Sequence, residues 1–395
     1  MAKPLDGLKI IDLTRVLAGP FSTMLLADLG ANVIKIENPK GGDDSRGFGP
    51  FKNGYSAYYI GLNRSKRGIT LNLKEERAKE IFKKLIQKAD ILVENYKPGT
   101  MKKLGLDYEV LKAINPRLIY AASSGFGQTG PYSSRAAYDL IVQGMSGFMS
   151  VTGFDIKQPV KAGCSIADIL AGIFTALGIL AALQHRNKTG RGQMVDIAMM
   201  DCMIATLENA IAEYDCTNKV PLPFGNTHRS IAPFATYPTS DGFVNVCAGN
   251  DELWRKFCES IGMNEYITDK RFENNRARVE NVKELTKIVS EYTVKRTTSE
   301  WMQALGEVMV PCGPIMNIEQ VVNDPQVKAR NMIVEMEHPE IGKFKVPGVP
   351  FSFSETPVSI KSFAPLLGEH NFEVYGEELG LSREEVETLA KDGVI

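Results

Sequence analysis

In the first half of this chain, segments with a strand-like pattern of apolar residues alternate with segments that have a helix-like pattern. Short apolar runs of strand length are separated by longer segments in which apolar residues recur every three or four positions, as on one face of a helix. The predicted strands are residues 8–13, 33–36, 91–93, 118–122 and 194–198, and the predicted helices are residues 21–29, 74–89, 108–114 and 169–183. Strands that alternate with helices are typical of an α/β fold with a mostly parallel sheet covered by helices.

The first of these units has the outline of a Rossmann-like nucleotide-binding fold. The strand 8–13 leads into the turn 15–20, a helix and a second strand that ends at Glu37. The turn holds a single glycine, Gly19, rather than the Gly-x-Gly-x-x-Gly fingerprint of dinucleotide sites. A ligand is expected beyond the carboxyl ends of the strands, whereas a dinucleotide there is weakly supported.

The second half predicts a separate small domain. Residues 222–243 are rich in proline and show no regular spacing of apolar residues. Residues 251–308 show the apolar spacing of amphipathic helices and carry many charges. The predicted organisation is a large α/β domain at 1–200 completed by 340–395, a linker at 201–225, a smaller α+β domain at 226–320 and a second linker at 321–339.

Composition narrows the class of protein. The 395 residues carry a net charge of −1, so no basic field favours nucleic acid or an anionic membrane. The six cysteines show no Cys-x-x-Cys spacing and no histidine at metal-ligand spacing, so no metal site is predicted and a cytoplasmic protein with free thiols is expected. The N-terminus lacks the apolar core of a signal peptide. The run 169–183 has fifteen residues, too few to span a bilayer, and is interpreted as a buried helix.

Asp168 is the leading candidate for chemistry. It stands three residues after Ser165, directly before the apolar run 169–183. Ser-x-x-Asp is a capping-box pattern, and the helix dipole would favour an ionised carboxylate at that position. An ionised, immobilised carboxylate also suits a covalent nucleophile. Position alone therefore leaves a structural cap and a catalytic group both open.

Nine motifs in order give a specific family resemblance. The chain contains DLTRVLAGP, GANVIKIE, LNLK, ENYKPGTMKKLGLDYE, SGFGQTGP, YDLIVQGMSG, SIADILAG, GRGQMVDIAM and GNTHRSIAPF. In this order the motifs resemble the class III CoA-transferase family, also called the formyl-CoA transferase or CaiB/BaiF family. The resemblance covers essentially the whole chain. It implies a homodimer in which two ring-like chains interlock.

The resemblance assigns the nucleophile to Asp168. It implies that this carboxylate attacks an acyl-CoA donor to give an aspartyl–acyl anhydride, which the CoA thiolate converts into an aspartyl-CoA thioester. A short acceptor acid, with a dicarboxylic acid such as oxalate expected first, then takes over the CoA. Because an anhydride retains the energy of the thioester, no ATP is needed, and covalent catalysis divides the exchange into easier steps. CoA thioesters are therefore expected as substrates, with no permanently bound cofactor.

The resemblance also implies a set of CoA contacts. The matching positions are Val16, Ala18, Leu71, Lys74, Asn95, Tyr96, Lys103 and Tyr138. Lysine ammonium groups suit the phosphates of CoA, and an aromatic ring such as that of Tyr96 can stack on adenine. A lone lysine is more often part of a solvated helix face, so for Lys74 and Lys103 the phosphate contact depends on the family match.

Two alternative functions remain open. An α-methylacyl-CoA racemase would need a base at the substrate α-carbon, and related racemases carry histidine where this chain has Tyr138, whose ordinary pKa near 10 suits proton abstraction poorly. A dinucleotide-dependent oxidoreductase lacks its glycine fingerprint here.

Three further residues are candidates for the substrate site. Leu17 stands where oxalate-specific relatives carry glutamine. His228 is a candidate for contacting the substrate, capping a helix or packing in an interface, and Arg229 is a candidate for pairing with an acceptor carboxylate.

Overall fold

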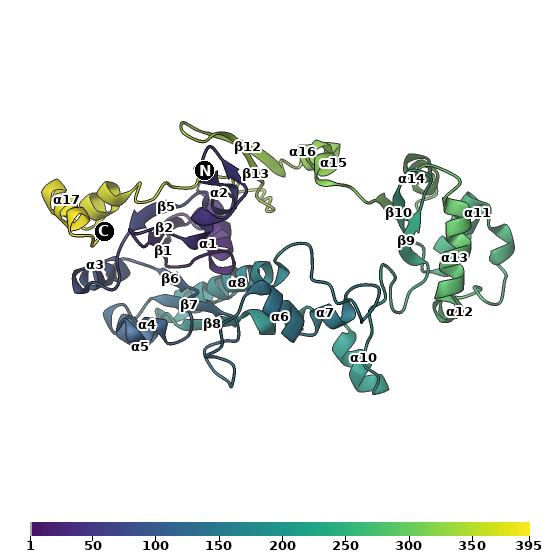
Figure 1. Ribbon diagram of the computed structural model, residues 1–395, viewed down its shortest axis with the longest axis horizontal. Coiled ribbons are helices and arrows are strands. Elements are labelled where there is room, and N and C mark those ends of the chain that lie inside the picture. Colours follow the sequence, from purple (N-terminus) through teal and green to yellow (C-terminus); the bar gives the residue numbers. More distant parts are fainter. Residues whose placement is uncertain (1) are drawn as a thin grey trace. The chain divides into compact units, whose positions relative to one another are not determined.

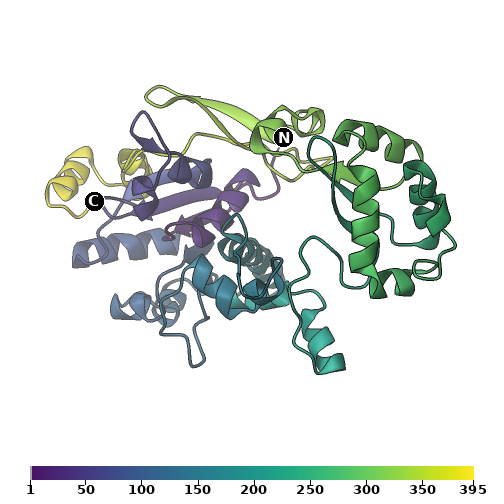
Figure 2. The ribbon, with the colours of Figure 1, turned by 45° about the vertical axis from the view of Figure 1, so that its right-hand side comes forward.

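The structure is a computed structural model that describes residues 2–395 and contains two compact units (Figures 1 and 2). The first unit comprises residues up to 148, residues 161–208 and residues 325–395, and the second comprises residues 149–160 and 209–324. The first unit therefore takes its residues from both ends of the chain. The linkers at 201–225 and 321–339, and the domain limits drawn from the sequence, stay predictions.

A six-stranded parallel sheet forms the centre of the first unit. Its strands, in spatial order, are β5 (Arg67–Thr70), β2 (Asn32–Glu37), β1 (Lys9–Asp12), β6 (Ile91–Glu94), β7 (Ile119–Ser124) and β8 (Met194–Ala198). Ile10 in β1 is paired with Val33 on one side and with Ile91 on the other. The predicted α/β class with a parallel sheet is confirmed. The chain winds outward from β1 in both directions, the order of doubly wound nucleotide-binding folds, whose ligands bind where the winding reverses.

Helices cover both faces of this sheet. The helices of the first unit are α1 (Ala18–Asp28), α2 (Ala57–Asn63), α3 (Glu76–Gln87), α4 (Thr100–Lys103), α5 (Tyr108–Ile114), α6 (Asp139–Met145), α8 (Ile166–Thr189), α9 (Met199–Ala205), α16 (Pro325–Ala329) and α17 (Arg383–Lys391), with α7 (Phe148–Val151) at the end of its first segment. Alternate strand residues face opposite layers: in β2, Ile34 and Ile36 pack toward α3 and α17, whereas Val33 packs toward α1 and α8. Both layers are apolar, as in buried parallel sheets.

The predicted elements differ from the observed ones in two informative places. Helix α1 begins at Ala18 and so includes Pro20, because a proline in the first helical turn removes only an N–H that has no partner within the helix. Strand β5 was not predicted, because its sequence Arg-Gly-Ile-Thr contains one large apolar residue and gives no apolar run.

Helix α8 is longer than the predicted run, and the length argument against a membrane span was wrong. It has 24 residues and is long and apolar enough to cross a membrane by length and composition alone. Its inner face packs on α1, and Gly172 permits this closeness: a Cβ there would lie 2.8 Å from the carbonyl oxygen of Ala18 and 2.9 Å from the Phe21 ring. The helix ends at Gly190, whose φ of 74° suits glycine.

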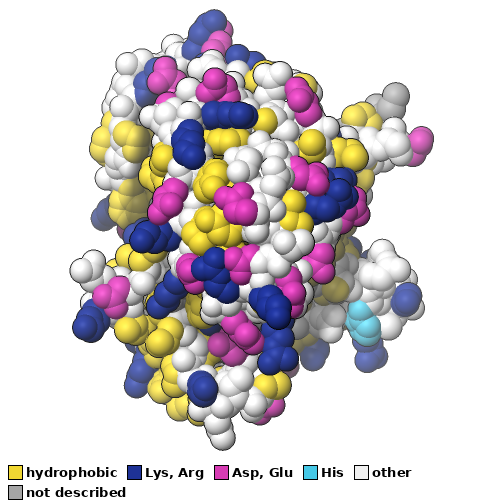
Figure 3. Space-filling model, turned by 90° about the vertical axis from the view of Figure 1, so that its right-hand side faces the viewer, with side chains coloured by type: hydrophobic (Ala, Val, Ile, Leu, Met, Phe, Trp, Pro, Cys, Tyr) yellow, Lys and Arg dark blue, Asp and Glu magenta, His cyan; other side chains and the backbone are white. Residues whose placement is uncertain are grey.

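The second unit has its own core. Strands β9 (Phe234–Pro238), β10 (Phe243–Cys247) and β11 (Cys312–Pro314) form an antiparallel sheet in the order β11-β10-β9. Its helices are α10 (Ala210–Thr217), α11 (Asp251–Ile261), α12 (Asn275–Glu280), α13 (Val282–Thr293), α14 (Thr298–Glu307) and α15 (Ile318–Asn323). Trp254, Phe257 and Trp301 are buried against the sheet. On the face that Figure 3 presents, acidic and basic side chains are interspersed, without a region of one sign.

Two small sheets complete the first unit. Strands β3 (Phe51–Lys52) and β4 (Tyr55–Ser56) form one hairpin, and β12 (Ile333–His338) with β13 (Gly342–Pro347) forms the other. Ile341 and Val346 of the second hairpin pack with Tyr59 and Ile60 of α2. The C-terminal segment therefore completes the hydrophobic core of the N-terminal one.

Candidate active site

Asp168 lies in the first turn of α8, but the capping box expected from the sequence is not formed. Ser165 occupies the N-cap position, and its hydroxyl makes no capping hydrogen bond. The prediction that Ser165 would hold the helix start was therefore wrong. Its backbone φ of −78° and ψ of 70° depart from the extended geometry that lets an N-cap side chain reach the first-turn N–H groups.

A second carboxylate supplies the cap from another helix. Asp139, at the start of α6, accepts a hydrogen bond from the backbone N–H of Ala167 with its Oδ1 at 2.9 Å. Its Oδ2 accepts one from the buried Gln143 amide at 2.6 Å. The Oε1 of Gln143 in turn accepts from the N–H of Ala162 at 2.9 Å. Asp139 and Gln143 thus fix the start of α8 and the segment that enters it.

The Asp168 carboxyl is also not the strongly ionised group that its position suggested. Burial, with a smaller contribution from the charge of Asp139, raises the pKa of Asp168 to about 7 from an ordinary value of 3.8. Both effects act against the helix dipole, which favours the ionised form. A carboxylate of higher basicity is a stronger nucleophile, and near neutral pH a substantial fraction of it is ionised. The environment therefore suits a nucleophilic carboxylate better than a structural cap.

Tyr58 on α2 is electrostatically coupled to this carboxyl group. Burial raises the pKa of the Tyr58 hydroxyl to about 12, and the charges of Asp168, Asp43 and Asp139 add to the effect in that order. The Tyr58 ring packs edge-to-face on Phe48 with the centroids 5.7 Å apart. Tyr58 was not a candidate in the sequence, because nothing in its neighbourhood there distinguishes it from a core tyrosine. The raised pKa keeps the Tyr58 hydroxyl neutral beside the charges that act on it.

A cavity of about 410 Å³ opens at the carboxyl ends of the central strands. The ends of β1, β2, β5 and β6 and the loops that follow them supply its walls. Its lining residues are Leu13, Thr14, Arg15, Ile36, Glu37, Asn38, Lys40, Gly42, Asp43, Asp44, Leu71, Asn72, Leu73, Lys74, Tyr96, Thr100 and Leu104. Apolar side chains, three cations and three acids therefore line one cavity where a doubly wound sheet binds its ligand, and the cations suit the phosphates of a nucleotide.

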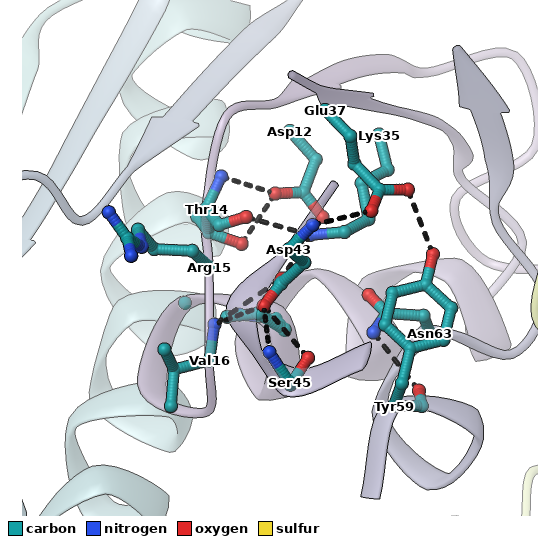
Figure 4. A network of polar contacts seen from close by, with 12 residues as sticks. Asp12, Thr14, Arg15, Val16, Lys35, Glu37, Asp43, Ser45, Tyr59 and Asn63 are labelled. Atoms are coloured by element: carbon teal, nitrogen blue, oxygen red, sulfur yellow. Dashed lines mark hydrogen bonds and ion pairs between the residues drawn. The ribbon is translucent and has the colours of Figure 1, made fainter. Parts of the chain in front are cut away.

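A buried polar network shapes one wall of this cavity (Figure 4). The ammonium group of Lys35 donates to the carbonyl oxygen of Thr14 at 2.7 Å and to Asp43 Oδ2 at 2.9 Å. Asp43 also accepts from the backbone N–H of Val16 at 3.1 Å, which holds Val16 at a φ of 67°. Burial alone would raise the pKa of Asp43, but Lys35 and Ser45 hold it well below its usual range.

The network continues beneath the loop that follows β1. The buried Asp12 accepts from the N–H of Thr14 at 2.8 Å and from Lys66 at 3.0 Å. The Lys66 ammonium group also donates to Asn63 Oδ1 and to the carbonyl oxygen of Pro20. Buried charges in such contacts are costly to separate, so they fix the loop at residues 14–16 firmly.

The structure brings three of the predicted CoA contacts into the cavity wall. Leu71, Lys74 and Tyr96 line it together. Asn95 does not line the cavity but holds the backbone of Arg15, which does. The Asn95 amide accepts from the N–H of Arg15 and donates to the Arg15 carbonyl oxygen, both at 2.8 Å. Burial raises the pKa of the Tyr96 hydroxyl to about 12, so this ring offers a neutral surface for stacking.

The other predicted contacts lie outside the lining. Val16 belongs to the network beside the cavity, and Ala18 is buried against α8. Lys103 is exposed at the end of α4. Tyr138 is 73% exposed at the start of α6 and does not line this cavity.

His228 and Arg229 belong to the second unit, and both are engaged there. The His228 ring packs on Phe234 with the centroids 5.2 Å apart. The Arg229 guanidinium pairs with Glu213 at 3.0 Å and donates to the carbonyl oxygen of Leu222 at 2.6 Å. An acceptor carboxylate would have to displace Glu213, so the suggested role of Arg229 gains no support.

Sequence reasoning missed several residues that shape the site. Asp43, Lys35 and the cavity-lining Lys40 and Asp44 were not singled out, although the run Gly41-Gly42-Asp43-Asp44 after β2 is the kind of glycine-rich, polar loop that lies at a strand end. The capping role of Asp139 could not be found from spacing, because it depends on the packing of α6 against α8. Among residues 2–395 no group of three or more His, Cys, Asp or Glu side chains is placed to hold a metal ion.

These features define a class: a doubly wound α/β protein with a nucleotide-sized cavity at its strand ends and a partly buried, basic carboxyl at a helix start in the same unit. Comparison with known sequences identifies the family. The family model described as CoA-transferase family III matches residues 5–371. The chain belongs to this family and is an enzyme of the CoA-transferase class.

Individual relatives agree with that assignment. The chain is 43% identical to the succinate–glutarate CoA-transferase of Agrobacterium fabrum over 95% of each sequence. It is also 43% identical to the acetyl-CoA:oxalate CoA-transferase of Acetobacter aceti over 89% of each. Among solved structures, a CaiB/BaiF family protein from Brucella suis superimposes with a TM-score of 0.85 at 40% identity, over 95% of this chain and all of that one. Relatives that are named for different acids thus share the same percentage identity with this chain.

Proposed function

We propose that this enzyme transfers CoA from an acyl-CoA donor to a short dicarboxylic acid through covalent intermediates on Asp168. The observation that carries the proposal is the Asp168 carboxyl, held at the start of α8 with its pKa raised to about 7. A carboxyl used only as a helix cap would be stabilised in its ionised form and would have a lowered pKa. The family membership supports the same conclusion.

The proposed reaction has four steps. The Asp168 carboxylate attacks the thioester carbonyl of the donor, forming an anhydride and releasing the CoA thiolate. The thiolate attacks the aspartyl carbonyl of the anhydride, forming an aspartyl-CoA thioester and releasing the donor acid. The acceptor carboxylate attacks that thioester, giving a second anhydride and the thiolate. The thiolate then attacks the acceptor carbonyl, forms the new acyl-CoA and frees Asp168.

Each group at the site has a part in this scheme. The cavity at the strand ends would hold the nucleotide of CoA, with Lys74 near its phosphates and Tyr96 against its adenine. Residues 14–18 run from this cavity into α1, whose first residue, Ala18, packs beside Ala171 of α8. Asp139 would keep Asp168 aligned and basic through the cap at Ala167 and its own charge. Rigid placement of this kind lowers the cost of reaching the reactive geometry.

The acceptor acid is proposed as a class rather than a compound. The two relatives at 43% identity are named for succinate and glutarate in one case and for oxalate in the other. Oxalate, expected first from the sequence, is therefore one candidate among short dicarboxylates. A panel of oxalate, malonate, succinate, glutarate and the monocarboxylate propionate, each with acetyl-CoA and succinyl-CoA, tests the proposal. Turnover of propionate alone, or of no acid, would contradict it.

We also propose that the enzyme acts as a homodimer with interlocked chains in the cytoplasm. Helix α8 exposes 43% of Ile173 and 57% of Leu177, and α6 exposes Leu140 and Ile141, an apolar surface that a second copy would cover. The six cysteines are free thiols, as in reducing compartments. Sedimentation equilibrium tests the assembly, and a monomer at all concentrations would refute it. The linkers proposed at 201–225 and 321–339 would let two chains thread through each other.

A further inference from the structure

Arg15 is held firmly by its backbone while its side chain remains half exposed. Its N–H and carbonyl oxygen are both bound by the Asn95 amide, at 2.8 Å each. The next residue, Val16, donates its N–H to the buried Asp43. The Arg15 side chain, with 50% of its surface exposed, lines the cavity at the strand ends. The backbone that carries this guanidinium group is therefore fixed, while the group itself lies in the cavity wall.

The partner of Arg15 in this structure is Asp44. The two side chains form an ion pair, and the Asp44 side chain is 47% exposed. Asp44 is the first residue of a short 3₁₀ turn at 44–47, and it lines the same cavity as Arg15. An ion pair this exposed contributes little stability, typically up to about 1 kcal/mol, so a stronger partner can replace either member.

The other acids of the cavity wall are not available to compete in this way. Glu37 is paired with Arg46 at 2.7 Å, and Asp43 is paired with the buried Lys35 at 2.9 Å. Both of these carboxylates are almost fully buried. The remaining cations of the wall, Lys40 and Lys74, form no ion pair within residues 2–395. The Arg15–Asp44 pair is thus the exchangeable contact in a wall whose other charges are either fixed or solvated.

We propose that Asp44 competes with a phosphate group of CoA for Arg15, and that this competition sets how tightly the nucleotide is held. The inference rests on the proposed function, since it takes CoA as the ligand of the cavity. A phosphate accepts the planar fork of a guanidinium in the same two-bond geometry as a carboxylate and carries more charge. When CoA binds, the guanidinium moves from Asp44 to the phosphate. When CoA leaves, Asp44 takes the guanidinium back.

This exchange would serve an enzyme that must release its thioester product. Arg15 adds to the affinity of the bound state, while Asp44 stabilises the free state of the same guanidinium. The apparent affinity then depends on the difference between the two contacts. Removing Asp44 tightens binding and slows product release, whereas removing Arg15 weakens binding.

Calorimetric titration of CoA into the full-length enzyme tests the competition in four variants. Asp44→Asn should tighten binding about two- to fivefold, the range expected when an exposed ion pair is lost from the free state. Arg15→Met should weaken binding at least about tenfold, as for loss of a charge-assisted hydrogen bond. In the Arg15→Met background, adding Asp44→Asn should change the dissociation constant less than about twofold, because Asp44 then has no guanidinium to withhold.

Glu75→Gln provides the matched control. Glu75 is an exposed acid next to the cavity-lining Lys74 and forms no ion pair within residues 2–395, so its removal changes the local charge equally without freeing Arg15. It should leave the CoA affinity within about 1.5-fold. Dephospho-CoA identifies the phosphate: a gain from Asp44→Asn that persists with this ligand assigns the diphosphate, and one that disappears assigns the 3′-phosphate.

Two results would overturn the proposal. One is an unchanged CoA affinity in Asp44→Asn. The other is an equal gain from Asp44→Asn with and without Arg15, which would make Asp44 a general source of repulsion. Either result can occur while Asp168 still forms its covalent intermediate, so failure of this inference is distinguishable from failure of the proposed function. Thermal melting of each variant establishes that the fold is retained.

Discussion

Replacing Asp168 by asparagine should stabilise the protein above neutral pH while abolishing its activity. Asparagine resembles the protonated carboxyl in size but cannot ionise. Because the folded-state pKa of Asp168 is raised to about 7 from 3.8, the unfolded chain loses this proton at lower pH than the folded one. Between these values the folded state holds more protons, so the wild type loses stability as pH rises. Asp168→Asn has no carboxyl group to ionise at this position, so it does not lose this stability as pH rises.

The expected gain in the free energy of unfolding follows from the difference between the folded and unfolded pKa values of Asp168. A difference between 3.8 and about 7 corresponds to about 4 kcal/mol at about 1.4 kcal/mol per pKa unit. Asp168 is only partly buried and solvent screens its charge, so we expect about 2 kcal/mol. The gain should be fully developed above about pH 7, should shrink as pH falls, and should vanish near pH 4.

Urea unfolding at pH 5, 6, 7 and 8, followed by far-ultraviolet circular dichroism, measures this gain. Tryptophan fluorescence is unsuitable, because Trp254 and Trp301 both lie in the second unit, whereas Asp168 lies in the first. Asp201→Asn, which removes an exposed acid from the first turn of α9, is the matched control. A gain that does not depend on pH, or a loss of stability at pH 8, would refute the reasoning.

Three further substitutions test separate parts of the account. Asp139→Asn removes the second charge near Asp168, so the acid limb of the pH profile of kcat/KM should move to lower pH; an unmoved limb would show that Asp139 does not tune the nucleophile. Asp43→Ala leaves Lys35 buried without its partner and should cost about 3–5 kcal/mol in urea unfolding and raise the KM for CoA; retention of both values would contradict the role given to the network. Gly172→Val places a Cβ 2.8 Å from the Ala18 carbonyl oxygen and should lower stability by about 1–3 kcal/mol, whereas an unchanged melting temperature would show that α1 and α8 can separate freely.

The parallel sheet could be predicted from the sequence because its inner strands are buried on both faces. Such strands appear as continuous apolar runs, and the predicted runs 33–36 and 91–93 lie within β2 and β6, whose residues are almost all buried. Strand β5 escaped prediction because it is an edge strand of four residues with little apolar character. Local pattern identifies strands that contain several large apolar residues and misses those that pairing with a neighbour defines.

The candidate site could be predicted in part because several of its residues follow strands of the sheet. Leu71 and Lys74 follow strand β5, Tyr96 follows strand β6, and the fold brings the three residues to one edge of the sheet. The capping of α8 by Asp139 and the contact between Arg15 and Asp44 depend on packing between distant segments, which no spacing along the chain encodes. The Ser165 cap failed because a local pattern competes with tertiary partners, and here the Asp139 carboxylate prevailed.

Trapping the covalent intermediate tests the central claim most directly. The enzyme is incubated with succinyl-CoA and then with hydroxylamine, and the peptide that contains Asp168 is analysed by mass spectrometry. The account predicts a hydroxamate on Asp168, formed only when an acyl-CoA is present and absent in Asp168→Asn. An unmodified Asp168 peptide in an enzyme that still exchanges CoA between acids, or full activity in Asp168→Asn, would contradict it.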